Sequence, residues 1–171
     1  MDKEPPQRLA EVVLVTAEGK VIGALPAVPV ETPWWQDGEP VLQAVRKHFG
    51  IEITLLRLLY TELPEPAGGR VTYLAEGSEP VDALPWHGVL GNHPLRLPYA
   101  RPGGHKTELD WALSELSRLG IAVTGRPQQV RTWNLSSVWR IPADGQTVWL
   151  KSVPPFFAHE GKMIAAMQGE N

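Results

Sequence analysis

Alternation and clustering of apolar positions predict several strands in the first half of the chain. Four runs are rich in β-branched or aliphatic residues, a composition that favours strands. They lie at residues 10–16, 21–25, 52–60 and 70–75. The turn residues EGK join the first two runs, and a pair of glycines precedes the last. We therefore expect a hairpin, followed by two more strands that pair with each other.

Two segments have the spacing of amphipathic helices. Residues 39–49 place apolar side chains on one face, and Gly50 is suited to end the helix. Asp37 is the expected N-cap of this helix. Residues 107–119 repeat the pattern, with an expected capping box that begins at Thr107.

The last third of the chain predicts a small antiparallel sheet and then a helix. The sequence ADG at residues 143–145 is typical of a hairpin turn between two strands. The expected strands are residues 129–134, 138–142 and 147–153, and the expected helix is residues 156–167.

Prolines divide this pattern into parts. The chain has 17 prolines, which gather at residues 26–40, 80–102 and 142–155, where we expect loops or short edge strands. The fold class that follows is α+β, with a small mixed sheet first and an antiparallel sheet last. The expected division is a first domain at residues 1–79, a linker at 80–104, and a helix with a second sheet at 105–171.

Composition narrows the class of protein. A chain of 171 residues can hold one ordinary domain or two small ones. The formal net charge of -3 argues against a nucleic-acid binder. The absence of cysteine excludes disulfides, thiolate zinc sites and cysteine nucleophiles. No long apolar stretch or secretory leader is visible, so we expect no membrane partner and a cytoplasmic location.

Isolated residues with reactive side chains give no further site. The five histidines lack metal-ligand spacing, and we expect them in loops or on the surface. The sequence GGHKT before the second helix differs from a P-loop, because a histidine stands where glycine must precede the lysine. The seven tryptophans could stack on sugars, but packing in a proline-rich domain explains them better. We expect no metal ligands and no catalytic residues.

Residues 9–76 resemble the Nudix hydrolase fold in element order, through a hairpin, a loop and the helix VLQAVRKHFGI. Active Nudix helices end in R-E-U-x-E-E-x-G-U, where U is bulky and aliphatic, and their glutamates bind magnesium. When the pattern is aligned on Gly50, Gln43 stands at the arginine position, and Ala44, Lys47 and His48 stand at the three glutamate positions. Lysine and histidine cannot replace carboxylates around Mg²⁺. The resemblance therefore implies an inactive cap, and an unrelated α+β domain stays open as the alternative.

The sequences WNLSSVWRI, VWLK and FFAHEGKMIAAM resemble the start of the N-terminal lobe in the aminoglycoside phosphotransferase family, which belongs to the protein-kinase-like superfamily. In that family a turn covers the phosphates of Mg-ATP, and a strand lysine contacts them. The resemblance assigns the turn to Asn134, Ser136 and Ser137, the lysine to Lys151, and the helix glutamate that orients this lysine to Glu160. The turn lacks the usual glycines, which fits small-molecule kinases better than protein kinases.

The catalytic part of such a kinase is missing from this sequence. No H-G-D-x-x-x-x-N motif occurs, since His87-Gly88 is followed by Val89, and too few residues follow Glu160 to form a second lobe. We therefore expect a kinase truncated within its N-terminal lobe. We expect no phosphoryl transfer by this chain alone. The sequence does not indicate the phosphoryl acceptor, because the acceptor pocket would lie in the absent lobe. The alternative is a non-catalytic binding or scaffold module, and Lys47 and His48 argue against an active diphosphate hydrolase.

Truncation would also leave apolar surface uncovered on the last helix. We therefore expect either a frayed or mobile last helix or self-association through it. The side chains concerned are Phe156, Phe157, Met163, Ile164 and Met167.

Overall fold

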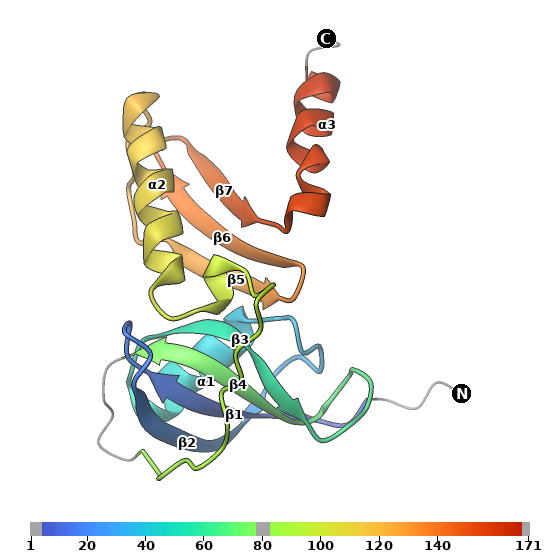
Figure 1. Ribbon diagram of the computed structural model, residues 1–171. Helices are drawn as coiled ribbons and strands as arrows, with labels where there is room; N and C mark the ends of the chain where they lie inside the picture. The colour runs from blue at the N-terminus through green and yellow to red at the C-terminus, as the bar shows by residue number, and fades with distance from the viewer. Residues whose placement is uncertain (1–4, 78–82, 169–171) are drawn as a thin grey trace.

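The computed structural model describes residues 5–77 and 83–168. Its fold is α+β, with a four-stranded sheet below a three-stranded sheet in Figure 1. The larger sheet contains β1 (Arg8–Val15), β2 (Val21–Val30), β3 (Ile53–Thr61) and β4 (Gly69–Gly77). Its strand order is β2-β1-β4-β3, and β1 pairs parallel to β4 while the outer pairs are antiparallel. The predicted mixed sheet is confirmed.

The first strand lies inside this sheet and is covered on both faces. Val12 and Leu14 point to one apolar cluster, and Val13 and Val15 point to another. Successive strand side chains alternate between faces, so burial on both sides requires the unbroken apolar run at residues 12–15 of β1. The first cluster includes helix α1 (Glu39–Phe49), and partly buried side chains of the segment after residue 83 complete the second.

Helix α1 has the bounds that the sequence predicts. Val41 and Val45 are buried, and Gly50 ends the helix in the left-handed conformation at φ 69°. The expected cap Asp37 was wrong, because Gly38 occupies the N-cap position and no side chain caps the helix. The Asp37 carboxylate instead forms an ion pair with Arg131 at 3.2 Å.

The second strand is longer than expected and continues to Val30 through two prolines. The expected end of this strand at residue 25 was therefore wrong. Strand β2 lies at the edge of the sheet. Proline is tolerated there because an N–H that faces solvent is not needed for pairing.

Helix α2 (Gly104–Arg118) begins earlier than predicted, so the capping box at Thr107 was also wrong. Gly103 is the N-cap, with φ 76°. A Cβ at Gly104 would lie 1.9 Å from the Pro98 carbonyl oxygen. Pro98 belongs to the short helix η1 (Pro98–Ala100). The close approach of the η1 backbone to Gly104 sets where α2 starts.

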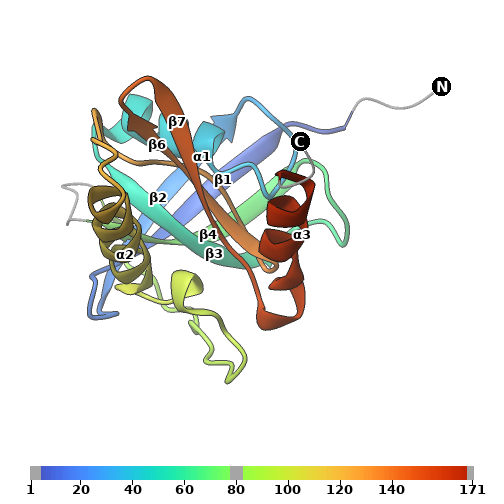
Figure 2. The same cartoon turned by 90° about the horizontal axis from the view of Figure 1, so that it is seen from above.

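The smaller sheet contains three antiparallel strands in the order β5-β6-β7. These are β5 (Gln128–Trp133), β6 (Ser136–Ala143) and β7 (Gln146–Ser152). Helix α2 covers one face, where Ala112, Leu116 and Ile141 form an apolar cluster. After β7 the chain passes through η2 (Pro155–Phe157) into α3 (His159–Gln168). Figures 1 and 2 both show α3 well apart from α2.

Buried hydrogen bonds join the two sheets. The Gln129 side chain accepts from the Leu55 amide at 2.8 Å and donates to the Leu55 carbonyl at 2.7 Å. His105 Nε2 lies 3.0 Å from the same carbonyl, and Trp139 Nε1 donates to His105 Nδ1 at 3.3 Å. His105 is thus buried rather than in a surface loop, which corrects the prediction for this histidine.

The segment between the sheets packs on the larger sheet. It forms an isolated bridge between Ala24 and Leu84, and Arg57 of β3 donates to the carbonyls of Leu90 and Ala100. The division into domains and a linker stays a prediction. Within the described ranges, no helix has both the length and the apolar character needed to cross a membrane.

Candidate functional site

Three of the five residues predicted to meet phosphates lie in the turn between β5 and β6 or at the start of β6. Asn134 is exposed at the tip of this turn, and Ser136 is half-buried at the start of β6. Ser137 is fully buried, and its hydroxyl has no hydrogen-bond partner among the described residues. Because side chains alternate along β6, Ser137 faces α2 with Trp139, whereas Ser136 faces the opposite side.

Lys151 lies on β7 at the same end of the sheet as this turn. It pairs with Val138, one position beyond the Ser137–Ser152 pair. By strand alternation its side chain shares the face of Ser136, away from α2. Lys151 is exposed on that face. The structure therefore brings Asn134, Ser136 and Lys151 to one end of the smaller sheet.

Glu160 is placed differently from the other four predicted residues. Its backbone belongs to the first turn of α3, and its side chain lies outside the described part of the structure. The helix η2 stands between it and β7. The pairing of Glu160 with Lys151 therefore stays a prediction.

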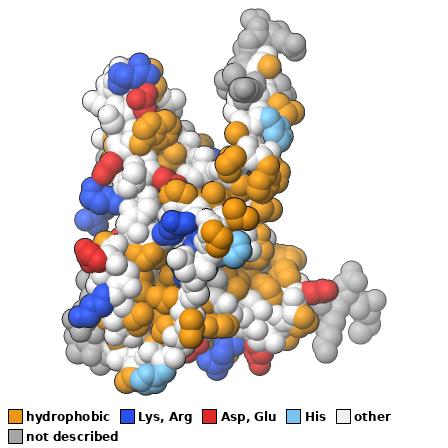
Figure 3. All heavy atoms as spheres, viewed as in Figure 1, with side chains coloured by type: hydrophobic (Ala, Val, Ile, Leu, Met, Phe, Trp, Pro, Cys, Tyr) orange, Lys and Arg blue, Asp and Glu red, His pale blue; other side chains and the backbone are white. Residues whose placement is uncertain are grey.

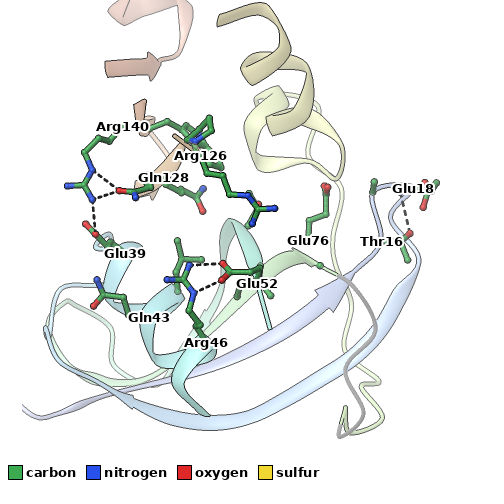
Figure 4. Close-up of a pocket in the computed structure, with 18 residues that line it drawn as sticks. Thr16, Glu18, Glu39, Gln43, Arg46, Glu52, Glu76, Arg126, Gln128 and Arg140 are labelled. Carbon is green, nitrogen blue, oxygen red and sulfur yellow. Dashed lines mark hydrogen bonds and ion pairs between the residues drawn. The ribbon is translucent and has the colours of Figure 1, made fainter. Parts of the chain in front are cut away.

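A cleft of about 870 Å³ lies toward the opposite end of the smaller sheet from the β5–β6 turn, between α1 and the start of β5. Figure 4 shows the polar side chains around it. Arg140 of β6 connects its two walls: its Nη2 donates to Glu39 at 3.1 Å and to Gln128 at 2.6 Å. This arginine is a link between β6 and α1 that the sequence did not indicate.

The remaining charges of the cleft are partly paired as well. Arg46 binds Glu52 through two hydrogen bonds of 2.5 and 2.6 Å, and these bonds lower the pKa of the Glu52 carboxyl. Figure 4 shows Arg126 reaching into the cleft above Glu52. Glu76 accepts a hydrogen bond from the Gly103 amide at 2.6 Å, so it helps to hold the start of α2. These interactions mainly hold the walls together.

The helix positions that correspond to Nudix magnesium ligands lie on the surface. Lys47 and His48 are exposed on α1, and His48 Nδ1 lies 2.8 Å from the Ala44 carbonyl. Among the described residues, no three acidic, histidine or cysteine side chains gather into a group that could hold a metal ion.

One site-lining residue was overlooked although the sequence contained a signal for it. Arg57 interrupts the otherwise apolar run LLRLLY of β3, and a charged residue within such a strand must find polar partners. It lines a second hollow of about 680 Å³, which also includes Asn134.

Comparisons with known proteins give no relative from which to assign this site. No family model, no curated protein and no solved structure matches the chain.

Proposed function

We propose that this chain is the N-terminal part of an ATP-dependent small-molecule phosphotransferase of the aminoglycoside phosphotransferase family. In this proposal the smaller sheet contacts nucleotide phosphates, and the catalytic lobe is not part of the chain. The observation that supports it best is the placement of Lys151. It lies on the third strand of an antiparallel sheet, at the end that carries the turn, and a helix follows this strand.

The chemistry of this end of the sheet suits a nucleotide phosphate. Lys151 supplies a compact positive charge. Asn134 and Ser136 add side-chain donors at the neighbouring turn, and hydroxyl and amide groups can bind phosphate oxygens without glycine. Trp149 shares the open face and is 55% exposed, which offers a flat apolar surface beside the charge.

Titration of ¹⁵N-labelled protein with Mg-ATP tests the proposal. We expect amide shifts at the β5–β6 turn and on β7, and binding at least about tenfold weaker after Lys151→Ala, because a hydrogen bond to a charged group contributes roughly 1.5–3 kcal/mol. Lys20→Ala, an exposed change in the turn between β1 and β2, is the matched control and should leave binding unchanged. Equal affinity in the Lys151 and Lys20 variants would contradict the proposal.

Acceptor-dependent ATP turnover is a separate measurement, and none is expected from this chain alone. No residue of the described sheet supplies the carboxylates that kinases use to activate the acceptor and hold magnesium. Turnover that disappears in Lys151→Ala would show that a catalytic residue had been overlooked.

A second candidate function is a non-catalytic scaffold with an inactive Nudix-like fold. The observation that favours it is the buried junction in which Gln129 and His105 hold Leu55 of β3. Such a junction supports the smaller sheet without any ligand. Absence of Mg-ATP shifts in a well-folded sample would favour this candidate over the phosphotransferase.

A further inference from the structure

A groove runs along the face that Figure 3 displays, between the loop at residues 93–97, β3, the β5–β6 turn and η2. Its volume is about 680 Å³. Most of its wall is apolar, with Leu58, Trp133 and Pro154 among the lining side chains. Phe156 forms the rim and is 65% exposed. Figure 3 shows basic side chains in the middle of this face, beside hydrophobic side chains that continue to the base of α3.

Two arginines enter this apolar surrounding. Arg57 donates to the carbonyls of Ala100 at 2.7 Å and Leu90 at 2.8 Å, and Arg96 donates to the Gly91 carbonyl at 2.6 Å. Both side chains are partly buried. Across the described ranges, neither guanidinium forms an ion pair with a carboxylate. Their polar contacts are neutral carbonyl groups.

The two positive charges are also close enough to repel each other. Burial, and then the charge of Arg96, lower the pKa of Arg57 to about 10. No carboxylate contributes to this shift. A like-charge pair in a partly desolvated site is unfavourable, and an anion between the two groups would relieve it. Each guanidinium has five N–H donors, so donors remain after the carbonyl bonds.

We propose that this groove binds a small organic anion with a flat apolar body, such as an aryl phosphate. The anionic group lies at Arg57 and Arg96, and the apolar body lies against Trp133, Pro154 and Phe156. The amide of Asn134 faces the same hollow as a further polar group. Asn134 also belongs to the proposed nucleotide contacts, but Lys151 does not line this groove. The arginine pair therefore does not depend on Lys151.

Three features of the groove define the ligand class. Arginine matches the geometry of phosphate or carboxylate better than that of neutral groups. An exposed phenylalanine next to proline and tryptophan offers area for an aromatic ring. An inorganic anion would leave the apolar surface of Trp133, Pro154 and Phe156 uncovered. A neutral aromatic compound would leave the positive charges of the two arginines without a counter-ion.

The direct test is a titration of ¹⁵N-labelled protein with 1-naphthyl phosphate. Inorganic phosphate and 1-naphthalenemethanol serve as probes for the anionic and apolar halves alone. We expect naphthyl phosphate to shift the amides of residues 93–100 and of Trp133, and to bind at least about tenfold more tightly than either half probe.

Variants then separate the two halves of the site. Arg96→Gln retains a donor for the Gly91 carbonyl and should weaken naphthyl phosphate about tenfold. Arg118→Gln, an exposed change on α2, is the matched control. Phe156→Ala removes a largely exposed ring that also contacts the Phe157 ring. It should weaken naphthyl phosphate several-fold and leave inorganic phosphate unaffected. Arg57 is retained because its two carbonyl bonds hold the loop.

Several results would overturn the inference. These are equal binding of the neutral alcohol, equal binding in Arg96→Gln and Arg118→Gln, or amide shifts confined to β7. Each variant is compared with the parent spectrum, so loss of the fold is recognised directly. Lys151→Ala should not change naphthyl phosphate binding, so failure of this site and failure of the nucleotide proposal are distinguishable.

Discussion

Replacement of Gln129 by leucine should weaken the junction between the two sheets. The side chain is buried, and both ends of its amide bind the backbone of Leu55, at 2.8 and 2.7 Å. Leucine has a similar size but can neither donate nor accept. The substitution therefore tests the hydrogen bonds more than the packing.

The magnitude follows from what happens to the two groups of Leu55. Its amide loses the partner on Gln129, and an unsatisfied buried donor costs about 1–3 kcal/mol. The Leu55 carbonyl still has His105 Nε2 as a hydrogen-bond partner at 3.0 Å. Losing the Gln129 bond to this carbonyl therefore costs little free energy. We expect the free energy of unfolding to fall by about 2 kcal/mol. For a domain of this length that lowers the melting temperature by about 4–8 °C.

Urea unfolding, followed by tryptophan fluorescence, measures this difference. Gln43→Leu, an exposed change on α1, is the matched control, and surface changes of this kind stay within about 0.5 kcal/mol. Hydrogen exchange provides a local measurement, because the Leu55 amide should exchange faster in the Gln129 variant. The reasoning is refuted if both variants unfold at the same urea concentration, or if exchange at Leu55 is unchanged.

Three other predictions concern the backbone contact at Gly104, the ionisation of Tyr73 and the exposed surface of α3. Gly104→Ala should lower the melting temperature clearly, since its Cβ would lie 1.9 Å from a backbone oxygen, whereas Gly161→Ala meets no heavy atom within 4 Å and should be neutral or stabilising; scanning calorimetry of both tests this. Burial raises the pKa of Tyr73 to about 12 from 10.0. Stability from its neutral form is therefore complete below about pH 10 and declines toward pH 12, so the alkaline loss in urea midpoint should shrink in Tyr73→Phe. Ile164 is 55% exposed on α3. We expect Ile164→Ser to lower the self-association constant measured by sedimentation. A sedimentation coefficient of the parent protein that does not change with concentration would contradict this prediction.

Local pattern was sufficient where structure depends on local contacts. The bounds of α1 followed from apolar spacing and from Gly50, which alone supplies the left-handed end. The pattern was insufficient where distant partners decide. The edge position of β2 lets it continue through Pro26, and the approach of η1 sets the start of α2 at Gly104. Neither neighbour can be read from the residues around those positions.

The candidate site divides in the same way. Strand alternation alone could have separated Ser136 from Ser137, because adjacent residues of one strand face opposite sides. The proximity of Lys151 to the turn also followed from hairpin pairing. Arg57 and Arg96 could not have been paired in advance, since one lies on β3 and the other in an irregular loop.

The larger sheet has a definite effect on the turn that carries Asn134. Three buried or partly buried bonds fix the strand before this turn: Gln129 to Leu55, Thr132 Oγ1 to the Leu56 carbonyl at 3.3 Å, and Tyr99 to the Trp133 carbonyl at 2.9 Å. The turn lies between the open face of the smaller sheet and the groove that contains Arg57 and Arg96. Because its base is anchored to β3 and η1, ligands on either side meet a turn that is already positioned. Ordering of the turn therefore costs a ligand little binding free energy, which is the physical advantage of joining the two sheets in one chain.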